Sequence, residues 1–476
     1  MKLNPLFALS RHSVSALLLC AAGAFGADPP NFVVVFIDDL GWGDFGCFGG
    51  QGARTPAIDR LAAEGRRFTQ FYVNSPICSP SRCALLTGQY PQRWRITSYL
   101  NNRAANERRG LAQWLDPKAP SLARTLKAAG YATGQFGKWH LGGQRDVDDA
   151  PPITAYGYDE SLTNFEGMGP KLLPLTLRPG EEKPERIWAD AERLGGPVKW
   201  TMRSEITTGF VEAAAAFIDR SVAGGRPFFV TIMPDDVHSP FWPPVTDFRE
   251  GRRGLYLAVL ESMDRQLERL FSKIRSDDRL RDRTVILLCS DNGPEPGAGS
   301  AGPLRGHKTQ LYEGGVRSPL IVWAPGLMRG ARGGADESSV LAAFDLAPSL
   351  ARMAGTTHGG SDGEDAAAAL LGSAPHVRSA PLFWRRPPDR KNWLPALPDP
   401  QPDLAVRDGR WKLLCEYDGT KPLLFDLESD PGETRDLAAA RPEVAARLVE
   451  SVLGWNRSMP SDAALPAGKA DAKKKR

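Results

Sequence analysis

The chain reads NFVVVFIDDLGWGD from Asn31 to Asp44. The first seven residues, Asn31–Ile37, form a continuous apolar and β-branched run, which is typical of a strand buried on both faces of a parallel sheet. Ligands of open α/β sheets bind beyond the carboxyl ends of the strands. The run therefore predicts an α/β fold, and it places the carboxylates of Asp38 and Asp39 where a site is expected.

Three further apolar runs predict neighbouring strands of the same sheet. They cover residues 131–136, 227–233 and 284–290, and another run, 319–324, follows later. Each of the first three ends in polar residues, which are Lys138 and His140, then His238, then Asp291 with Asn292. Because parallel strands end at one edge of a sheet, we expect these side chains to gather at one site.

Helical patterns lie between the strands. Residues 256–274 carry apolar side chains at helical spacing with charges opposite, as in a surface helix that covers a sheet. Shorter helices are predicted within 55–65, 121–129 and 212–220. This alternation indicates an α/β domain, which we expect to span residues 28–372.

The pattern changes after residue 380. Short strand candidates lie at 382–384, 404–407, 411–417 and 423–426, and the Asp-Gly turns at 408–409 and 418–419 favour antiparallel pairing. An amphipathic helix at 442–456 is expected to pack on them. We therefore predict a C-terminal α+β subdomain over 373–460, followed by a disordered basic tail, 461–476.

The N-terminus predicts export. Residues 1–27 carry Lys2 and Arg11, then an apolar run and small residues, as a secretory signal peptide does. No other stretch is apolar for long enough to predict a transmembrane helix. Removing the two charges lowers the formal net charge from +4 to +2, which indicates no nucleic-acid-binding face. We expect a periplasmic or extracellular protein.

A second stretch, Pro76–Gly88, combines Cys78, Pro80 and Arg82. We expect Pro80 to hold the residue before it extended, so that Cys78 lies on a surface-facing turn leading into a helix that starts near Ser81. A helix N-terminus favours anions, and the Arg82 guanidinium matches a tetrahedral oxyanion. After signal removal five cysteines remain, an odd number, so at least one lies outside any disulfide.

The string CSPSR at residues 78–82, followed by Leu-Thr-Gly at 86–88, resembles the signature of type I sulfatases. GKWHLG at 137–142 is similar to the family's second signature, and the Asp-Asp-x-Gly-Trp-Gly and Ser-Asp-Asn-Gly strings also match. The likeness covers nearly the whole mature chain. It implies an alkaline-phosphatase-like α/β/α sandwich with a mixed, mostly parallel central sheet, plus a smaller C-terminal subdomain of antiparallel sheet and helix.

The resemblance also implies cofactors. Cys78 is expected to be converted to formylglycine by a formylglycine-generating or an anaerobic sulfatase-maturing enzyme. One Ca²⁺ ion per site is expected, and its implied ligands are Asp38, Asp39, residue 78, Asp291 and Asn292. An oxygen-only side-chain set favours Ca²⁺ over Zn²⁺.

The implied catalytic residues are Cys78, Arg82, Lys138, His140, His238 and Lys308. The cationic side chains would stabilise charge on the transferring sulfate group, and His140 would take a proton from the hydrated formylglycine. Either His238 or Lys308 would protonate the departing alcohol. Val237 precedes His238 where the family commonly has proline, which is a departure from the pattern.

Two segments could reach the substrate. The stretch 90–115 is rich in Arg, Asn and Trp, and it is either a solvated loop or a sugar-binding wall whose rim includes Arg93, Arg103 and Arg108. Residues 145–200 show no clear periodicity and are expected to form a long insertion over the site.

These patterns together predict an exported sulfatase that acts on a sulfated carbohydrate, such as galactose or N-acetylgalactosamine sulfate in a polysaccharide or glycosaminoglycan. A phosphomonoester or phosphonate-ester hydrolase of the same superfamily remains an alternative. An inactive protein that binds sulfated glycans is an alternative of another class.

Overall fold

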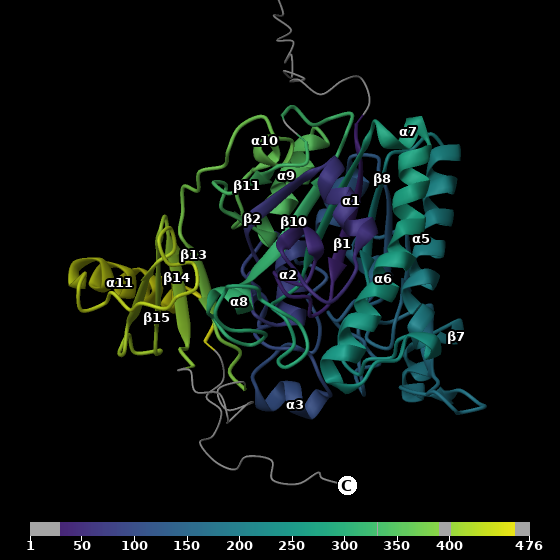
Figure 1. The fold of residues 1–476 in the computed structure, drawn as a ribbon, viewed down its shortest axis with the longest axis horizontal. Coiled ribbons are helices and arrows are strands. Elements are labelled where there is room, and N and C mark those ends of the chain that lie inside the picture. Colours follow the sequence, from purple (N-terminus) through teal and green to yellow (C-terminus); the bar gives the residue numbers. More distant parts are fainter. Residues whose placement is uncertain (1–28, 331, 390–400, 462–476) are drawn as a thin grey trace, which may run out of the picture.

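The computed structural model describes residues 29–330, 332–389 and 401–461. A large sheet with helices on both faces forms the main body, and a smaller sheet with one helix stands beside it (Figure 1). The expected signal peptide, 1–27, lies outside the described residues, as does all but the first residue of the expected tail.

The main sheet is mixed and mostly parallel, as expected. β1 pairs in parallel with β8 and β9, β3 pairs in parallel with β8 and β4, and β10 is antiparallel to β9 and β2. In spatial order its strands are β11 (Ala335–Asp336), β2 (Arg66–Tyr72), β10 (Arg317–Trp323), β9 (Thr284–Ser290), β1 (Asn31–Ile37), β8 (Phe228–Met233), β3 (Ala132–Gly137), β4 (Glu160–Thr163), β5 (Lys171–Thr176) and β6 (Glu185–Arg186). β12 (Leu341–Ala342) pairs with β2, and β7 (Val198–Met202) pairs with β5.

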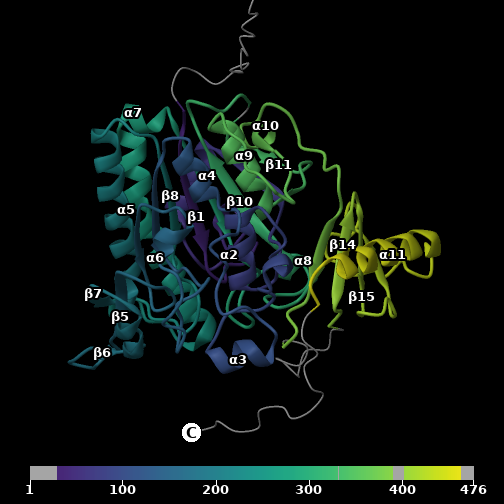
Figure 2. The same cartoon turned by 180° about the vertical axis from the view of Figure 1, so that it is seen from behind.

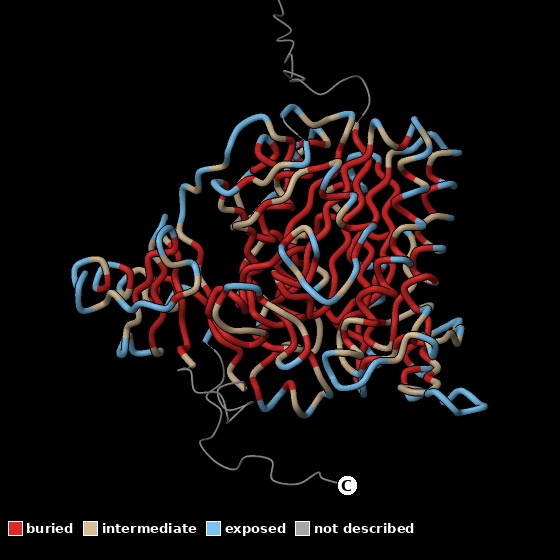
Figure 3. The backbone as a smooth tube through the Cα atoms, in the orientation of Figure 1, coloured by how far each residue is buried: buried red, intermediate tan, exposed pale blue. Residues whose placement is uncertain are grey.

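The alternation of side chains along β1 explains its unbroken apolar sequence. Phe32 and Val34 belong to the core on one face, whereas Val33 and Val35 belong to the core on the other. The first core is covered by α2 (Cys78–Thr87), α4 (Leu122–Ala128), α9 (Leu346–Met353) and α10 (Ala367–Leu370). The second is covered by α1 (Pro56–Glu64), α5 (Ile206–Ala223), α6 (Gly251–Ser276) and α7 (Asp278–Arg281). Figure 2 shows the α4 side, and Figure 3 shows the buried strands between the two layers.

The longest helix of the described residues is α6, and its opposite faces differ in polarity. No helix in the described ranges combines the length and the hydrophobicity needed to cross a bilayer.

The segment 145–200 differs from the expected insertion. It contains β4, β5, β6 and β7, which extend the main sheet beyond β3. β4, β6 and β7 are short and mostly partly exposed or exposed, so they carry no apolar run of the kind found in β1. β5 is largely buried, but Lys171 and Pro174 interrupt its apolar residues.

The C-terminal subdomain has the expected architecture. Its antiparallel strands are β13 (Leu382–Arg385), β14 (Leu404–Asp408), β15 (Trp411–Cys415) and β16 (Leu423–Asp426), and α11 (Pro442–Ser458) packs on them. Trp384 fixes this sheet to the main body, because its indole Nε1 donates a hydrogen bond to the Val73 carbonyl at 2.7 Å.

A buried ion-pair network joins the same two parts. The Lys412 ammonium lies 2.9 Å from a carboxylate oxygen of Glu313 and 3.0 Å from one of Glu433, and all three side chains are fully buried. Tyr72 donates a hydrogen bond to Glu313 at 2.6 Å. Because Glu313 begins α8 (Glu313–Val316), five residues after Lys308, the network fixes the loop that carries this lysine.

We predict that Lys412→Met lowers the free energy of unfolding by about 3–5 kcal/mol, because it leaves the buried Glu433 without its cation and Glu313 with Arg317 alone. The control is Lys421→Met, which removes an 80% exposed lysine 3.8 Å from Glu416 and should change stability by less than about 1 kcal/mol. Chemical denaturation of the full chain measures both. Equal effects would show that the network does not stabilise the interface.

Candidate active site

The carboxyl ends of β1 and β9 bring four polar side chains together. Asp38 and Asp39 follow β1, Asp291 and Asn292 follow β9, and all four are fully buried. The Asn292 amide donates to an Asp39 carboxylate oxygen at 2.8 Å, and the Asp39 backbone N–H donates to Asp291 at 3.2 Å. Asp39 adopts a left-handed conformation with φ 59°, which turns the chain sharply at the strand end.

This cluster fits a hard divalent cation. Carboxylate oxygens of Asp38, Asp39 and Asp291 lie within 4.8 Å of one another. Within the described residues, Asp38 Oδ1 and Asn292 Oδ1 accept no hydrogen bond although both are buried. Burial and the nearby charge of Asp38 raise the pKa of Asp291 well above its usual range, so a cation is needed to keep all three ionised. Oxygen donors of this kind suit Ca²⁺.

Three cationic side chains surround the cluster. Arg82 donates to Asp291 at 2.8 Å, Lys138 donates to Asp38 at 2.7 Å, and Lys308 donates to Asp39 at 2.5 Å. Burial alone would raise the pKa of Asp38, but Lys138 and the neighbouring cationic groups hold it well below its usual range. Each carboxylate thus has a cationic neighbour, and the same cations are placed to bind an incoming anion.

Cys78 occupies a different position from the expected one. The helix α2 begins at Cys78, with Ile77 as its N-cap, and Cys78 is only 3% exposed. Pro80 is accommodated because it lies in the first helical turn, where no backbone N–H needs an intrahelical partner. The proline therefore did not force an extended Ser79 and a surface-facing turn. Burial raises the pKa of the Cys78 thiol despite the nearby lysines, so the unmodified residue is a poor nucleophile.

His140 is held by two backbone groups. The backbone N–H of His140 donates to the Glu166 carbonyl at 2.9 Å, and its ring Nε2 lies 3.0 Å from the Leu100 carbonyl. Since a carbonyl can only accept, Nε2 carries the proton and Nδ1 is the basic atom. Burial lowers the pKa of His140 to about 4, which keeps the ring neutral near pH 7.

His238 lies at the outer side of the cluster. Its Nε2 is 3.6 Å from an Asp39 carboxylate oxygen, and its side chain is 35% exposed. Its Nδ1 donates to the Ser239 carbonyl at 2.6 Å, which fixes the ring orientation. Unlike Lys308, this side chain therefore combines contact with the cluster and access from solvent.

Glu166 is a site residue that sequence reasoning missed. It lies between β4 and β5, and its Oε2 is 3.3 Å from both the Lys138 ammonium and His140 Nδ1. Burial opposes its charge, but His140 and Lys138 lower the pKa of Glu166 to about 2. No motif marks this position, and only recognising β4 as a strand that ends near the site could have indicated it.

The three expected rim residues do not lie together. Arg93 forms an ion pair with Asp362 at 2.6 Å, and the backbone N–H of Asp362 donates to the carbonyl of Gly88 at the C-terminal end of α2. A ten-residue helix spans about 15 Å, so Arg93 is far from Cys78. The chain comes back to the site at Leu100, whose backbone N–H donates to the Ser79 hydroxyl at 3.0 Å.

Arg103 and Arg108 follow this return, at the two ends of α3 (Arg103–Arg108). Arg103 pairs with Asp149 at 2.5 Å, and Arg108 is exposed. In Figure 1, α3 lies at the same end of the main sheet as the carboxyl end of β1.

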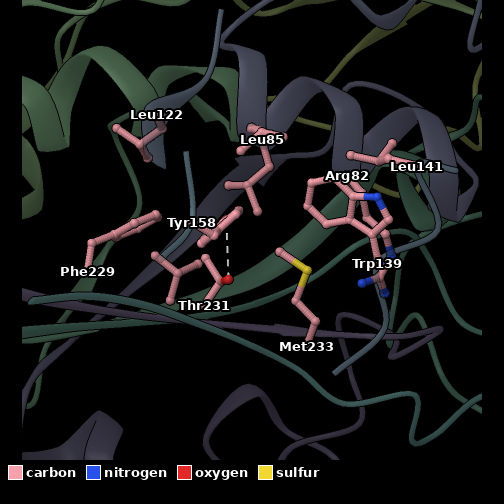
Figure 4. Close-up of a pocket in the computed structure, with 11 residues that line it drawn as sticks. Arg82, Leu85, Leu122, Trp139, Leu141, Tyr158, Phe229, Thr231 and Met233 are labelled. Atoms are coloured by element: carbon pink, nitrogen blue, oxygen red, sulfur yellow. Dashed lines mark hydrogen bonds between the residues drawn. The ribbon is translucent and has the colours of Figure 1, made fainter. Parts of the chain in front are cut away.

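A small cavity is lined in part by Arg82 (Figure 4). Its volume is about 10 Å³, and its walls are mainly apolar side chains such as Leu85, Trp139 and Phe229. This space holds one water molecule at most, so it is a packing defect beneath the site and not a substrate pocket.

Comparison with known proteins decides the family. A family model described as Sulfatase matches residues 30–356. The chain belongs to the sulfatase family. The expected type I, arylsulfatase-like membership is thereby confirmed, and the chain is a sulfuric ester hydrolase.

Sulfatase relatives cover most of the chain. Human arylsulfatase A is 32% identical over 473 residues, which cover 91% of this chain and 89% of the relative. N-acetylgalactosamine-6-sulfatase of Canis lupus familiaris is 33% identical over 388 residues, which cover 78% of this sulfatase and 72% of the relative. The solved structure of Ps i-CgsB in complex with k-i-k-neocarrahexaose has a TM-score of 0.74 and 25% identity, and the match covers 90% of this chain and 93% of that chain. The alkaline-phosphatase-like fold is confirmed.

We predict that Ca²⁺ raises the thermal unfolding midpoint of chelator-treated protein by several degrees, because it relieves repulsion among three buried carboxylates. Asp291→Asn should abolish most of this increase. The matched control is Asp219→Asn on the exposed face of α5, which should leave the increase intact. A Ca²⁺ response that persists in Asp291→Asn would place the metal elsewhere.

Proposed function

We propose that this sulfatase hydrolyses a sulfate monoester on a carbohydrate, with formylglycine at position 78. The observation that carries the proposal is the position of Cys78, at the N-terminus of α2 and beside a buried carboxylate cluster with three cationic neighbours. The helix terminus and these cations favour an anion next to residue 78.

Hydrated formylglycine at position 78 would supply a nucleophilic hydroxyl, and Ca²⁺ held by Asp38, Asp39, Asp291 and Asn292 would supply positive charge for the transferring group. Arg82, Lys138 and Lys308 bind and orient the transferring group. Because Arg82 also donates to the Lys138 carbonyl at 3.0 Å, these groups are fixed before the substrate arrives.

The two histidines have separate roles in this proposal. His140 Nδ1, the unprotonated ring atom, would take a proton from the second hydroxyl of the hydrated residue 78, the one that does not attack sulfur, so that the aldehyde re-forms as the bond to sulfate breaks. His238 in its doubly protonated form would give its Nε2 proton to the departing alcohol and keep the Nδ1 proton on the Ser239 carbonyl, because Nε2 lies at the exposed side of the cluster. Lys308 is less suited to this task, since its ammonium is buried against Asp39.

A sulfated saccharide is the proposed substrate. Relatives include an N-acetylgalactosamine-6-sulfatase and a structure solved with a neocarrahexaose, which supports a galactose or N-acetylgalactosamine sulfate. The arginines of α3 offer guanidinium groups for further sulfate or carboxylate groups of a chain.

Export and maturation complete the proposal. Residues 1–27 would direct the protein to the periplasm or the cell exterior. Since Cys78 is buried in the folded chain, a formylglycine-generating or anaerobic sulfatase-maturing enzyme would reach it before folding is complete.

Cys78→Ala should reduce kcat for 4-nitrophenyl sulfate by about 10³-fold or more, because it removes the proposed nucleophile. Its control is Cys83→Ala, a buried cysteine of the same helix that takes no part in the mechanism. Circular dichroism checks that both variants fold. Turnover of phosphate esters alone by the mature wild type would favour the phosphatase alternative, and absence of all turnover would favour a binding protein.

We further predict that Arg103→Ala and Arg108→Ala raise KM for a sulfated oligosaccharide by about threefold or more, with little change for 4-nitrophenyl sulfate, which does not extend beyond the sulfate pocket. Arg93→Ala is the control, since its ion pair lies at the far end of α2. Steady-state kinetics on both substrates separates these effects. Equal losses on both substrates would contradict a role in saccharide binding.

A further inference from the structure

Among the ion pairs of the described residues, the side chain of Glu166 contacts only Lys138 and His140, two groups of the site. The backbone of Glu166 already positions the site, because its carbonyl accepts from His140 and its N–H donates to Asn164 at 2.9 Å. Its side chain is 8% exposed, and Oε2 makes no hydrogen bond within the described residues. A buried charge held only by contacts at 3.3 Å is costly to keep. The charge itself is therefore the feature that needs an explanation.

The carboxylate sets the charge that an incoming anion meets. With a divalent ion bound, Arg82, Lys138, Lys308 and that ion would carry five positive charges, against four negative charges on Asp38, Asp39, Asp291 and Glu166. The net charge of these groups would be +1, and without Glu166 it would be +2. The neighbouring charges of Arg203, Asp235 and Asp236 are the same in both cases.

Sulfate and phosphate monoesters differ in charge although their geometry is alike. A sulfate monoester carries one negative charge, whereas a phosphate monoester carries about 1.5 to 2 near pH 7. In a buried site of low effective dielectric constant, one additional charge changes the affinity for an anion strongly. A carboxylate next to the anion-binding Lys138 thus penalises the dianion more than the monoanion.

We propose that Glu166 is a specificity-determining residue that selects singly charged sulfate esters against doubly charged phosphate esters. This inference rests on the proposed function, since it assumes that the ester group binds among Arg82, Lys138 and Lys308. It assigns selectivity to a residue that touches the binding lysine and not to the residues of the metal cluster.

The test compares Glu166→Gln, which keeps the shape and removes the charge, with the wild type. In mature enzyme, the ratio of kcat/KM for 4-nitrophenyl sulfate to that for 4-nitrophenyl phosphate should fall by about tenfold or more. Glu166→Asp, which keeps the charge, should retain a ratio close to that of the wild type. Glu261→Gln removes a buried carboxylate of α6 that pairs with Arg249, and it should leave the ratio unchanged.

Binding without turnover provides an independent measurement. Calorimetry of the Ca²⁺-loaded protein with methanesulfonate and inorganic sulfate compares a singly and a doubly charged anion that share a tetrahedral sulfur. Glu166→Gln should strengthen binding of inorganic sulfate relative to methanesulfonate by about tenfold. If this variant folds poorly, as thermal unfolding will show, Glu166→Ser provides a second neutral side chain.

Two outcomes would overturn the inference. A loss of equal size on both esters would make Glu166 a residue that only positions Lys138 and His140, and an unchanged ratio with unchanged anion binding would leave it without a role in selectivity. Failure of the proposed function gives a different result, because the wild type would then cleave no sulfate ester. Calorimetry would still measure how Glu166 changes the relative affinity for inorganic sulfate and methanesulfonate.

Discussion

Mutual repulsion among Asp38, Asp39 and Asp291 is the constraint on which the site depends. These carboxylates are buried at the ends of two adjacent parallel strands, β1 and β9. Their charges are close together and are poorly screened by water. Arg82, Lys138 and Lys308 each approach one of them, and a divalent cation would complete the balance. The cations that stabilise the cluster also favour binding of an anion.

The fold brings these groups together from distant parts of the sequence. Asp38 and Lys138 are held by β1 and β3, which flank β8, and Lys308 is held by a loop that the C-terminal subdomain supports through Glu313 and Lys412. The helix α2 brings Arg82 and residue 78 to the same edge, with its N-terminus toward the cluster. The smaller subdomain therefore contributes to the site through the position of one loop, although none of the residues assigned a catalytic role belongs to it.

Much of this could be predicted from the sequence, because two-sided burial leaves a clear pattern. The runs at Asn31–Ile37 and Thr284–Ser290 coincide with β1 and β9, and the residues that follow them form the cluster. Short motifs likewise pointed to Lys138, His140 and His238. The predictions that were wrong, for residues 145–200 and for the turn at Pro80, have physical causes as well. β4 and β7 are short and partly exposed, and Lys171 and Pro174 interrupt the apolar residues of β5. Pro80 fits the first turn of α2 and does not precede it.

The positions of Glu166 and Arg93 relative to the site could not be predicted from the sequence pattern. Glu166 reaches the site only because β4 extends the sheet, and a single glutamate between two weak strands carries no signal of its own. Arg93 follows the α2 helix closely in sequence, yet the length of that helix carries it away from Cys78. Proximity in sequence to a catalytic residue is thus a poor guide when a helix lies between.

The central claim is that residue 78 acts as formylglycine among these cations. The most direct test is mass spectrometry of the tryptic peptide that contains residue 78, from protein produced with and without a maturation enzyme. The specific sulfatase activity of each preparation is measured alongside. The account predicts a peptide lighter by the change from thiol to aldehyde, in a fraction that rises in proportion to sulfatase activity. Full activity in protein that contains only unmodified Cys78 would contradict it.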